Sequence, residues 1–248
     1  MAKTLANCRT QTRMYLDEST EADWEDTEVD LEINAGYQEV VTSVMETYEN
    51  FYLVTGTFNT VADQQEYGTA DGFPTDFFKL IRVEINYDTT NSNSVPSRAK
   101  PIDINNVQRD LGNSALGITV YRNAAYYLYG SSTGSSGVKL GFIPIPTRNG
   151  TNAVKIWYIP TISDLSSSTD NLNIPYVDRY FKLVSLYAAS QLLRKGQQEE
   201  TAAGNYMREF LLGLERMKQQ LEDRVSDDVK QVVDTVGMDI DFSNFSNI

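Results

Sequence analysis

Residues 23–48 read DWEDTEVDLEINAGYQEVVTSVMETY. Its apolar side chains recur every three or four residues, at Val29, Ile33, Tyr37, Val40 or Val41, Val44 and Tyr48. This spacing places them on one face, so the stretch predicts an amphipathic α-helix that ends near Asn50. Residues 23–26 at its start offer an N-cap and a first turn rich in carboxylates, which the helix dipole favours.

A shorter helix is predicted before it, over residues 4–16. One side of that helix carries Leu5, Cys8, Thr12 and Tyr15 or Leu16. Cys8 is the only cysteine, so it cannot form an internal disulfide, and we interpret it as a small helix residue.

The middle of the chain, residues 51–160, predicts β structure. The segments 77–85, 118–129, 138–145 and 154–159 are rich in β-branched and aromatic residues and are separated by turn residues. Residues 123–125 interrupt the second segment and predict a hairpin within it. The prolines at 144 and 146 close the third segment and favour an edge position for its end.

Helices are predicted again from Pro175, which suits a first helical position. The apolar stripe of the first helix consists of Tyr176, Tyr180, Leu183, Val184, Tyr187 and Leu192. A break at Gly196 precedes a second helix with Tyr206, Phe210, Leu214, Met217 and Leu221 at near-heptad spacing.

After Val225 the helical pattern weakens, and apolar and polar residues alternate without a partner in the chain. The apolar positions at the end of this arm are Ile240, Phe242, Phe245 and Ile248. Such an arm is either disordered or ordered by pairing with a neighbouring chain, and we predict that these four residues contact another protein.

The order of helices, then strands, then helices predicts an α+β fold. We expect residues 1–50 and 163–225 to form one helical body. An antiparallel β region, residues 51–162, is inserted into it, and residues 226–248 form an extended C-terminal arm.

The composition argues against catalysis. The chain has no histidine, so Ser-His-Asp and Cys-His arrangements cannot form, and the usual proton-transfer and metal-ligating side chain is missing. The sequence contains no phosphate-binding loop, dinucleotide fingerprint or metal-ligand cluster, so no cofactor or metal is predicted. Sites built from carboxylates alone remain open.

The formal charge is −13, and no Lys or Arg lies between Arg13 and Lys79. Such a surface repels phosphate and does not hold nucleic acid. The acidic cluster at the start of the long helix consists of Glu21, Asp23, Glu25, Asp26 and Glu28. It is interpreted as a solubilising and helix-capping surface or as one that repels DNA passing nearby; its spacing does not fit a calcium loop.

A second candidate surface lies in the β region and consists of Tyr121, Tyr126, Tyr127 and Tyr129. Tyrosines most often pack in a core, but this cluster is also a candidate for a surface contact or for stacking on sugars. The sequence has no signal peptide and no run of 18 apolar residues, which predicts an intracellular product without a membrane span.

Short motifs distributed along the chain resemble those of the head-to-tail adaptor (connector) proteins of tailed bacteriophages. They are Trp24-Glu25-Asp26, INAGYQEV at 33–40, QEY at 65–67, FPTDF at 73–77, KLIRV at 79–83, Pro101-Ile102, LGFIPIP at 140–146, IWY at 156–158, Ile174-Pro175, Tyr180, Ala188-Ala189, Leu192-Leu193, Tyr206 and Phe210. The chain departs from the family pattern at Gly68, where a short insertion is expected.

This resemblance implies a virion structural protein in the neck, made in the host cytoplasm. It implies a ring, commonly of twelve subunits, beneath the portal protein. Tail or nozzle proteins would dock on the ring, and DNA would pass through its channel. The resemblance also implies that the β region, with its tyrosine cluster, contacts a tail protein or a neighbouring subunit. The family brings no catalytic residues. Alternatives are another tail completion or terminator protein, a carbohydrate-binding module and a carboxylate-dependent hydrolase.

Overall fold

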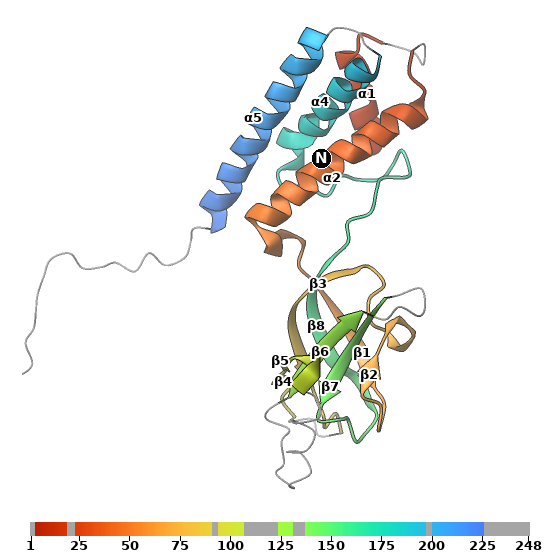
Figure 1. Cartoon of the computed structure of the whole chain (residues 1–248), viewed down its shortest axis with the longest axis vertical. Coiled ribbons are helices and arrows are strands. Elements are labelled where there is room, and N and C mark those ends of the chain that lie inside the picture. The colour runs from red at the N-terminus through yellow and green to blue at the C-terminus, as the bar shows by residue number, and fades with distance from the viewer. Residues whose placement is uncertain are drawn as a thin grey trace, which may run out of the picture. The chain divides into compact units, whose positions relative to one another are not determined.

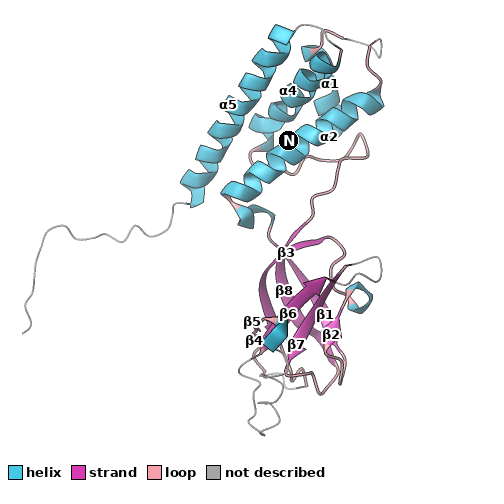
Figure 2. Ribbon diagram, in the orientation of Figure 1, coloured by secondary structure: helices cyan, strands magenta, loops and turns pink. Residues whose placement is uncertain are grey.

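The computed structural model describes residues 3–18, 23–90, 94–106, 124–130, 137–196 and 200–225. Helices and strands are both prominent in it (Figures 1 and 2). Four α-helices and two largely antiparallel sheets make up the described residues, which confirms the predicted α+β class. The chain divides into two compact units. We call Met1–Tyr48 with Ser166–Ile248 the helical unit, and Glu49–Leu165 the β unit.

The helical unit contains α1 (Leu5–Tyr15), α2 (Asp26–Thr47), α4 (Val177–Lys195) and α5 (Glu200–Val225). Helix α4 packs against the other three (Figure 1). Helix α1 begins with a capping box in which the side chains of Thr4 and Asn7 each accept a hydrogen bond from the other's backbone N–H. The predicted positions Leu5, Cys8 and Thr12 are all buried.

Helix α2 buries the apolar face that its sequence predicts. Val29, Ile33, Tyr37, Val40, Val41 and Val44 are at most 2% exposed. The helix begins at Asp26, and its N-cap, Glu25, forms no side-chain capping hydrogen bond. Gly36 lies against Tyr187 of α4, where an added Cβ would lie 2.9 Å from the ring. A glycine at this position therefore lets the two helices approach closely.

Helix α4 begins later than predicted. Tyr176 adopts a left-handed conformation with φ of 49°, so the first helical residue is Val177 and not Pro175. The spacing of apolar residues does not reveal the backbone conformation of a single residue, so the predicted start was wrong. The predicted break at Gly196 is confirmed, since Gly196 is the C-cap of α4. In α5 the predicted Phe210, Met217 and Leu221 are buried.

The β unit contains two four-stranded sheets. In the first, the order is β1 (Val54–Thr60), β8 (Gly150–Pro160), β3 (Phe77–Ile85) and β4 (Ser97–Arg98). In the second, it is β2 (Glu66–Tyr67), β7 (Val138–Ile143), β6 (Ala125–Gly130) and β5 (Lys100–Pro101). Only the β5–β6 pairing is parallel among those described. Three short 3₁₀ helices are also described, η1 (Glu49–Tyr52), η2 (Thr69–Asp71) and η3 (Ile104–Asn106).

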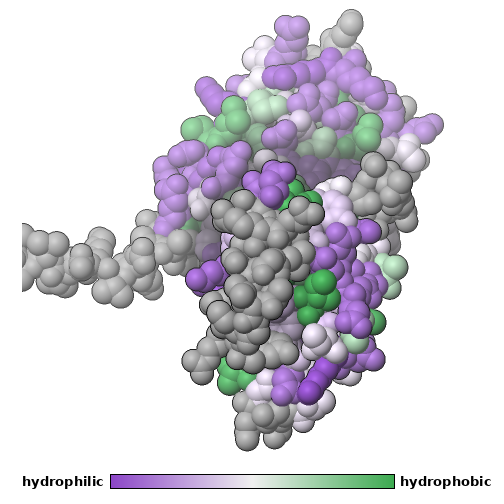
Figure 3. Space-filling view, turned by 60° about the horizontal axis from the view of Figure 1, so that its bottom comes forward, coloured by the Kyte–Doolittle hydropathy of each residue, from purple (hydrophilic) through white to green (hydrophobic). Residues whose placement is uncertain are grey.

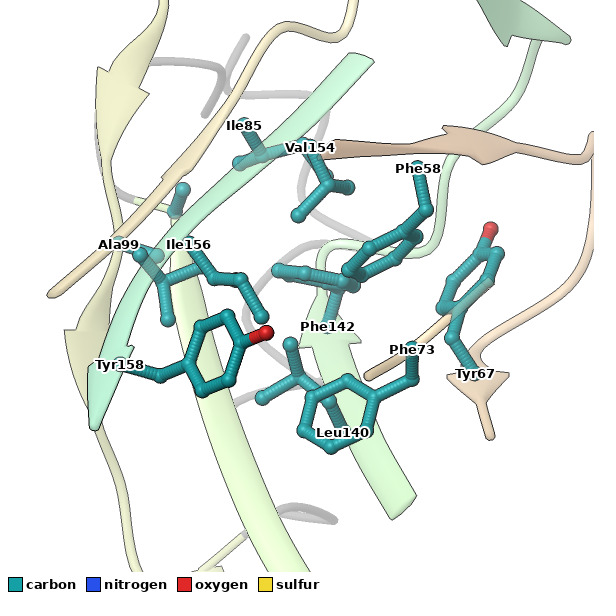
Figure 4. Close-up of a cluster of buried hydrophobic side chains, with 12 residues drawn as sticks. Phe58, Tyr67, Phe73, Ile85, Ala99, Leu140, Phe142, Val154, Ile156 and Tyr158 are labelled. Carbon is teal, nitrogen blue, oxygen red and sulfur yellow. The ribbon is translucent and has the colours of Figure 1, made fainter. Parts of the chain in front are cut away.

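One hydrophobic core joins the two sheets, and its side chains point toward one another in Figure 4. Sheet one contributes Phe58, Val83, Ile85, Val154, Ile156 and Tyr158, and sheet two contributes Tyr67, Leu140 and Phe142. Phe58 and Tyr67 lie 5.6 Å apart between ring centroids, and Tyr67 and Phe142 lie 5.8 Å apart. Burial of these aromatic side chains, together with the aliphatic ones, stabilises the unit.

The predicted strand over 77–85 is confirmed with its bounds, and β7 and β8 confirm the predicted segments near 138 and 154. Strand β7 ends at Ile143, before the two prolines, but it lies between β2 and β6 and is not at an edge. Of the segment 118–129, residues up to 123 lie outside the described residues, as does much of the predicted hairpin.

No α-helix among the described residues combines the length and apolar character needed to cross a membrane.

The contrast between two glycines tests the packing of α2 on α4. Gly36→Ala should lower the free energy of unfolding, because overpacking costs about 1–3 kcal/mol and exceeds the gain of about 1 kcal/mol in helix propensity. Gly204 of α5 has no atom within 4 Å of an added Cβ. Gly204→Ala should therefore raise stability by about 0.5–1 kcal/mol. Thermal unfolding followed by circular dichroism at helical wavelengths measures both; a stabilising Gly36→Ala would contradict the close contact.

Candidate functional site

The acidic start of α2 is bound by two arginines of α1. The Arg13 guanidinium lies 2.9 Å from Glu18 Oε2 and 2.8 Å from Asp26 Oδ1, and it also donates to the carbonyl oxygen of Trp24. Glu18 Oε1 accepts the backbone N–H groups of Asp23 and Trp24 at 2.7 and 3.2 Å. The side chains of Arg13 and Glu18 are only 11% and 6% exposed. This buried ion pair fixes the turn that leads into α2.

Arg9 makes the second connection between these helices. Its Nε and Nη2 donate to the two carboxylate oxygens of Asp30 at 2.9 and 2.6 Å, and its Nη1 donates to Asp26 at 2.7 Å. Because the Asp30 pair is bidentate, it sets the orientation of α1 against α2 as well as their distance.

A third cation comes from the end of α4. Lys195 Nζ lies 2.8 Å from Glu28 Oε1 and 5.5 Å from the centre of the Trp24 ring. The hydrogen bond to Lys195 lowers the pKa of Glu28, and the same bond raises the pKa of Lys195. Both side chains are well exposed, so this pair contributes little to stability.

The predicted acidic surface therefore has two kinds of member. Asp26 and Glu28 are in ion pairs that offset their charge. Asp23 and Glu25 are exposed and form no ion pair with a described residue. Glu21 lies outside the described residues. The DNA-repelling role of this surface stays a prediction, and Asp23 and Glu25 are the described members with unpaired charge.

The tyrosine cluster of β6 is organised around one carboxylate. The hydroxyls of Tyr127 and Tyr129 donate to Glu66 of β2 at 3.1 and 2.6 Å, and the two rings are stacked 6.1 Å apart. Tyr127 is 4% exposed and its ring lies directly over Gly141, where a Cβ would be 2.1 Å away. A buried ring cannot present its face to a sugar, so Tyr127 belongs to the core of the β unit.

The other predicted tyrosines differ in exposure. Tyr126 is partly buried against the core, and Tyr129 is also half-buried. Tyr121 lies outside the described residues. Contact of this cluster with a tail protein or neighbouring subunit stays a prediction, and Tyr126 and Tyr129 are the described members with accessible surface.

Within the described ranges, no group of three or more His, Cys, Asp or Glu side chains is placed to hold a metal ion. The Cys8 thiol is buried, and its burial raises its pKa to about 12. A polar surface pocket of about 190 Å³ is lined by residues that include Asn86, Asp88 and Arg148. None of these features brings together a nucleophile, a base and an oxyanion site.

The sequence pattern missed a set of exposed apolar residues on the helices. Met14 is 69% exposed, Leu31 65%, Leu211 55% and Leu212 53%. These residues lie outside the predicted apolar stripes. An apolar residue outside a stripe was the only feature of the sequence that could have indicated their exposure. On the face shown in Figure 3, hydrophobic residues reach the surface in small separate groups among hydrophilic ones. The arm residues Ile240, Phe242, Phe245 and Ile248 lie outside the described residues.

Comparison with known families decides the identity. The model of the SU10 adaptor protein family matches residues 3–232, which is nearly the whole chain. The chain belongs to the SU10 adaptor protein family. This agrees with the resemblance to phage head-to-tail adaptors, so the chain is a bacteriophage adaptor protein and a virion component. A search of curated proteins finds no match to the adaptor.

The buried ion pair of the adaptor can be tested by removing its cation. Arg13→Met takes the guanidinium away from the buried Glu18 carboxylate, and breaking a buried pair in this way costs about 3 kcal/mol or more. The expected result is a large loss in the free energy of urea unfolding. The double variant Arg13→Met with Glu18→Gln should recover part of it, since both charges are then gone. Lys195→Met, which breaks an exposed pair, is the control and should change little.

The Glu66 contacts predict the alkaline stability of the adaptor. The hydrogen bond to Glu66 raises the pKa of Tyr129 to about 12 from an ordinary 10.0, and burial together with Glu66 raises the pKa of Tyr127. The folded state therefore holds protons that the unfolded state has released. The stabilisation is complete below pH 10 and is lost as pH rises toward 12.

Glu66→Gln should consequently flatten the decline in the free energy of unfolding over this pH range. Part of the decline should remain, because burial and the bond to Asp76 raise the pKa of Tyr158 to about 12 and burial raises the pKa of Cys8 to about 12. Glu84→Gln is the matched control and should leave the slope unchanged, because Glu84 pairs with Arg82 and not with a tyrosine. Equal slopes for Glu66→Gln and the parent would contradict the assignment.

Proposed function

We propose that this adaptor forms a homo-oligomeric ring, dodecameric as in the family it resembles, beneath the portal protein in the virion neck. The ring gives tail or nozzle proteins their docking surface and leaves a channel through which DNA passes without specific binding. Its role is structural and not enzymatic. The observation that carries the proposal is the match of the adaptor family over residues 3–232.

The distribution of charge supports the channel. The helical unit holds 24 of the 34 Asp and Glu residues but only 12 of the 21 Lys and Arg residues, an excess of twelve negative charges. The β unit holds the remaining 10 acidic and 9 basic residues and is almost neutral. Repetition of the helical unit around a ring multiplies its negative potential, and DNA slides past such a wall without being held.

The acidic residues at the start of α2 are proposed to face this channel. Asp23 and Glu25 carry the proposal among the described residues, because their charge is not offset by ion pairs. Asp26 and Glu28 add to it less, since arginines of α1 and Lys195 neutralise them locally.

Two further contacts are proposed for the assembled neck. The C-terminal arm, through Ile240, Phe242, Phe245 and Ile248, contacts the portal protein or a neighbouring subunit. The β unit, through Tyr126 and Tyr129 together with Tyr121, contacts a tail protein or a neighbour. The near-neutral charge of the β unit suits protein contact better than that of the helical unit, because like charges across an interface are unfavourable.

Native mass spectrometry of the full chain mixed with the portal protein of the same phage tests the proposal. The expected result is a complex whose mass exceeds that of the portal by a ring of 27.9 kDa subunits. Deletion of residues 226–248 should weaken assembly and leave the circular dichroism spectrum of the folded body unchanged. A chain that stays monomeric with portal present would contradict the ring, and an undiminished affinity of the deletion variant would contradict the role of the arm.

A further inference from the structure

Helix α5 carries a pair of leucines that folding of the helical unit does not need. Its core-facing side already has Ala203, Phe210, Met217 and Leu221, each at most 3% exposed. Leu211 and Leu212 lie outside this stripe and are 55% and 53% exposed. The helix does not need leucine at these two positions. Polar residues with high helix propensity would stabilise it equally well and would not expose apolar surface.

Two arginines flank this pair along one row of the helix. Arg208, Leu212 and Arg216 follow one another at spacings of four residues, so they lie one above another on the same side of α5. Both arginine residues are exposed, and neither forms an ion pair with a residue that the structure describes. We call Arg208, Leu211, Leu212 and Arg216 the α5 face. It presents apolar surface between two cations whose charge is not offset.

Helix α2 exposes an apolar residue beside acidic residues, whereas α5 exposes apolar residues beside basic ones. Leu31 is 65% exposed, and the helix contains six acidic residues and no basic one. Asp26, Glu28, Asp30 and Glu46 are already in ion pairs within the unit. Glu32 and Glu39 form none with a described residue. Glu32 and Glu39 are seven residues apart and lie on one side of α2, and Leu31 borders that side about a quarter turn away. We call Leu31, Glu32 and Glu39 the α2 face; it presents an apolar side chain beside two anions.

We propose that the α5 face of one copy packs against the α2 face of the next copy, and that this contact closes the ring. The inference rests on the proposed ring and names the two surfaces that form it. A closed ring requires two different, complementary surfaces on each subunit, because its contacts are heterologous. The α5 and α2 faces belong to different helices that both pack on α4, so one subunit offers both (Figure 1).

Charge selects this pairing over its alternatives. Two α5 faces in contact would set arginine against arginine, and two α2 faces would set glutamate against glutamate. The cross-pairing brings Arg208 and Arg216 toward Glu32 and Glu39 and buries Leu31, Leu211 and Leu212 in the same contact. Such a contact gains apolar burial and locally offsets part of the like-charge repulsion that opposes assembly of acidic subunits. DNA is a poor occupant of the α5 face, because the helical unit carries twelve excess negative charges.

Site-directed cross-linking of the full chain tests the pairing. Leu212→Cys and Leu31→Cys are made as separate, differently tagged chains, mixed with portal protein and treated with a short bis-maleimide. The native Cys8 is fully buried and does not contribute. The expected product is a cross-linked pair that carries both tags. Either variant assembled alone should give no cross-linked pair, since each cysteine then faces a leucine.

Val95→Cys supplies the matched control, because Val95 is 80% exposed but lies in the β unit. It reports links that arise from random collision, and its yield with Leu212→Cys should stay low. Links between two Leu212→Cys chains, or a preference of Leu212→Cys for Met14→Cys, would overturn the proposed pairing. So would a ring of normal mass without links between positions 31 and 212.

A second variant gives the energetic side of the test. Leu212→Asp places a charge at the centre of the contact and should raise the concentration needed for half-assembly by at least about tenfold. Val95→Asp should leave that concentration unchanged. If the parent chain forms no ring with portal, the proposed function fails and this inference fails with it. If a ring forms and Leu212→Asp leaves its assembly unaltered, only the inference fails.

Discussion

The burial of α4 between the other helices is the interaction on which the architecture depends. Helices α1 and α2 come before the β unit, and α4 and α5 come after it, so the helical unit forms only when the chain returns. The returning segment is held by the backbone bond from Leu5 N–H to Asp170 O and by the bond from Asn173 N–H to the Tyr37 hydroxyl. Contacts at this sequence separation are costly in loop entropy, and the apolar faces that meet at α4 offset that cost.

Electrostatics act on two levels in this adaptor. Locally, Arg9 and Arg13 form ion pairs that join α1 to the start of α2. Over the whole molecule, the acidic excess is concentrated in one unit and almost absent from the other. Ion pairing therefore removes only part of the negative potential of the helices. What remains is a long-range field suited to repelling polyanions, and this field is independent of any single side chain.

Much of the fold could be predicted from the sequence because its long elements are strongly periodic. The faces of α2 and α5 and the strand at 77–85 follow directly from apolar spacing. Strand β1 was missed because its sequence, VTGTFNT, has only two apolar side chains, Val54 and Phe58, with Gly56 between them. Strands β4 and β5 have two residues each, too few to leave a pattern. The left-handed turn at Tyr176 is a local choice of the backbone that apolar spacing does not encode.

The candidate surfaces were harder to predict, because exposure and pairing depend on partners distant in sequence. Nothing near Tyr127 in sequence indicates that Gly141 leaves room for its ring, or that Glu66 accepts from its hydroxyl. Likewise Glu28 is paired only because Lys195 returns at the end of α4.

The insertion of the β unit has a consequence for how such proteins diverge. Its core consists of residues between Phe58 and Tyr158, and the helices are stabilised by other side chains. Substitutions in the cores of two separate compact units are expected to have additive effects on stability. The part of the gene that encodes residues 49–165 is therefore free to change, or to be exchanged by recombination, while the helices keep their packing. Changes in the core of one unit can in this way accumulate without compensating changes in the core of the other.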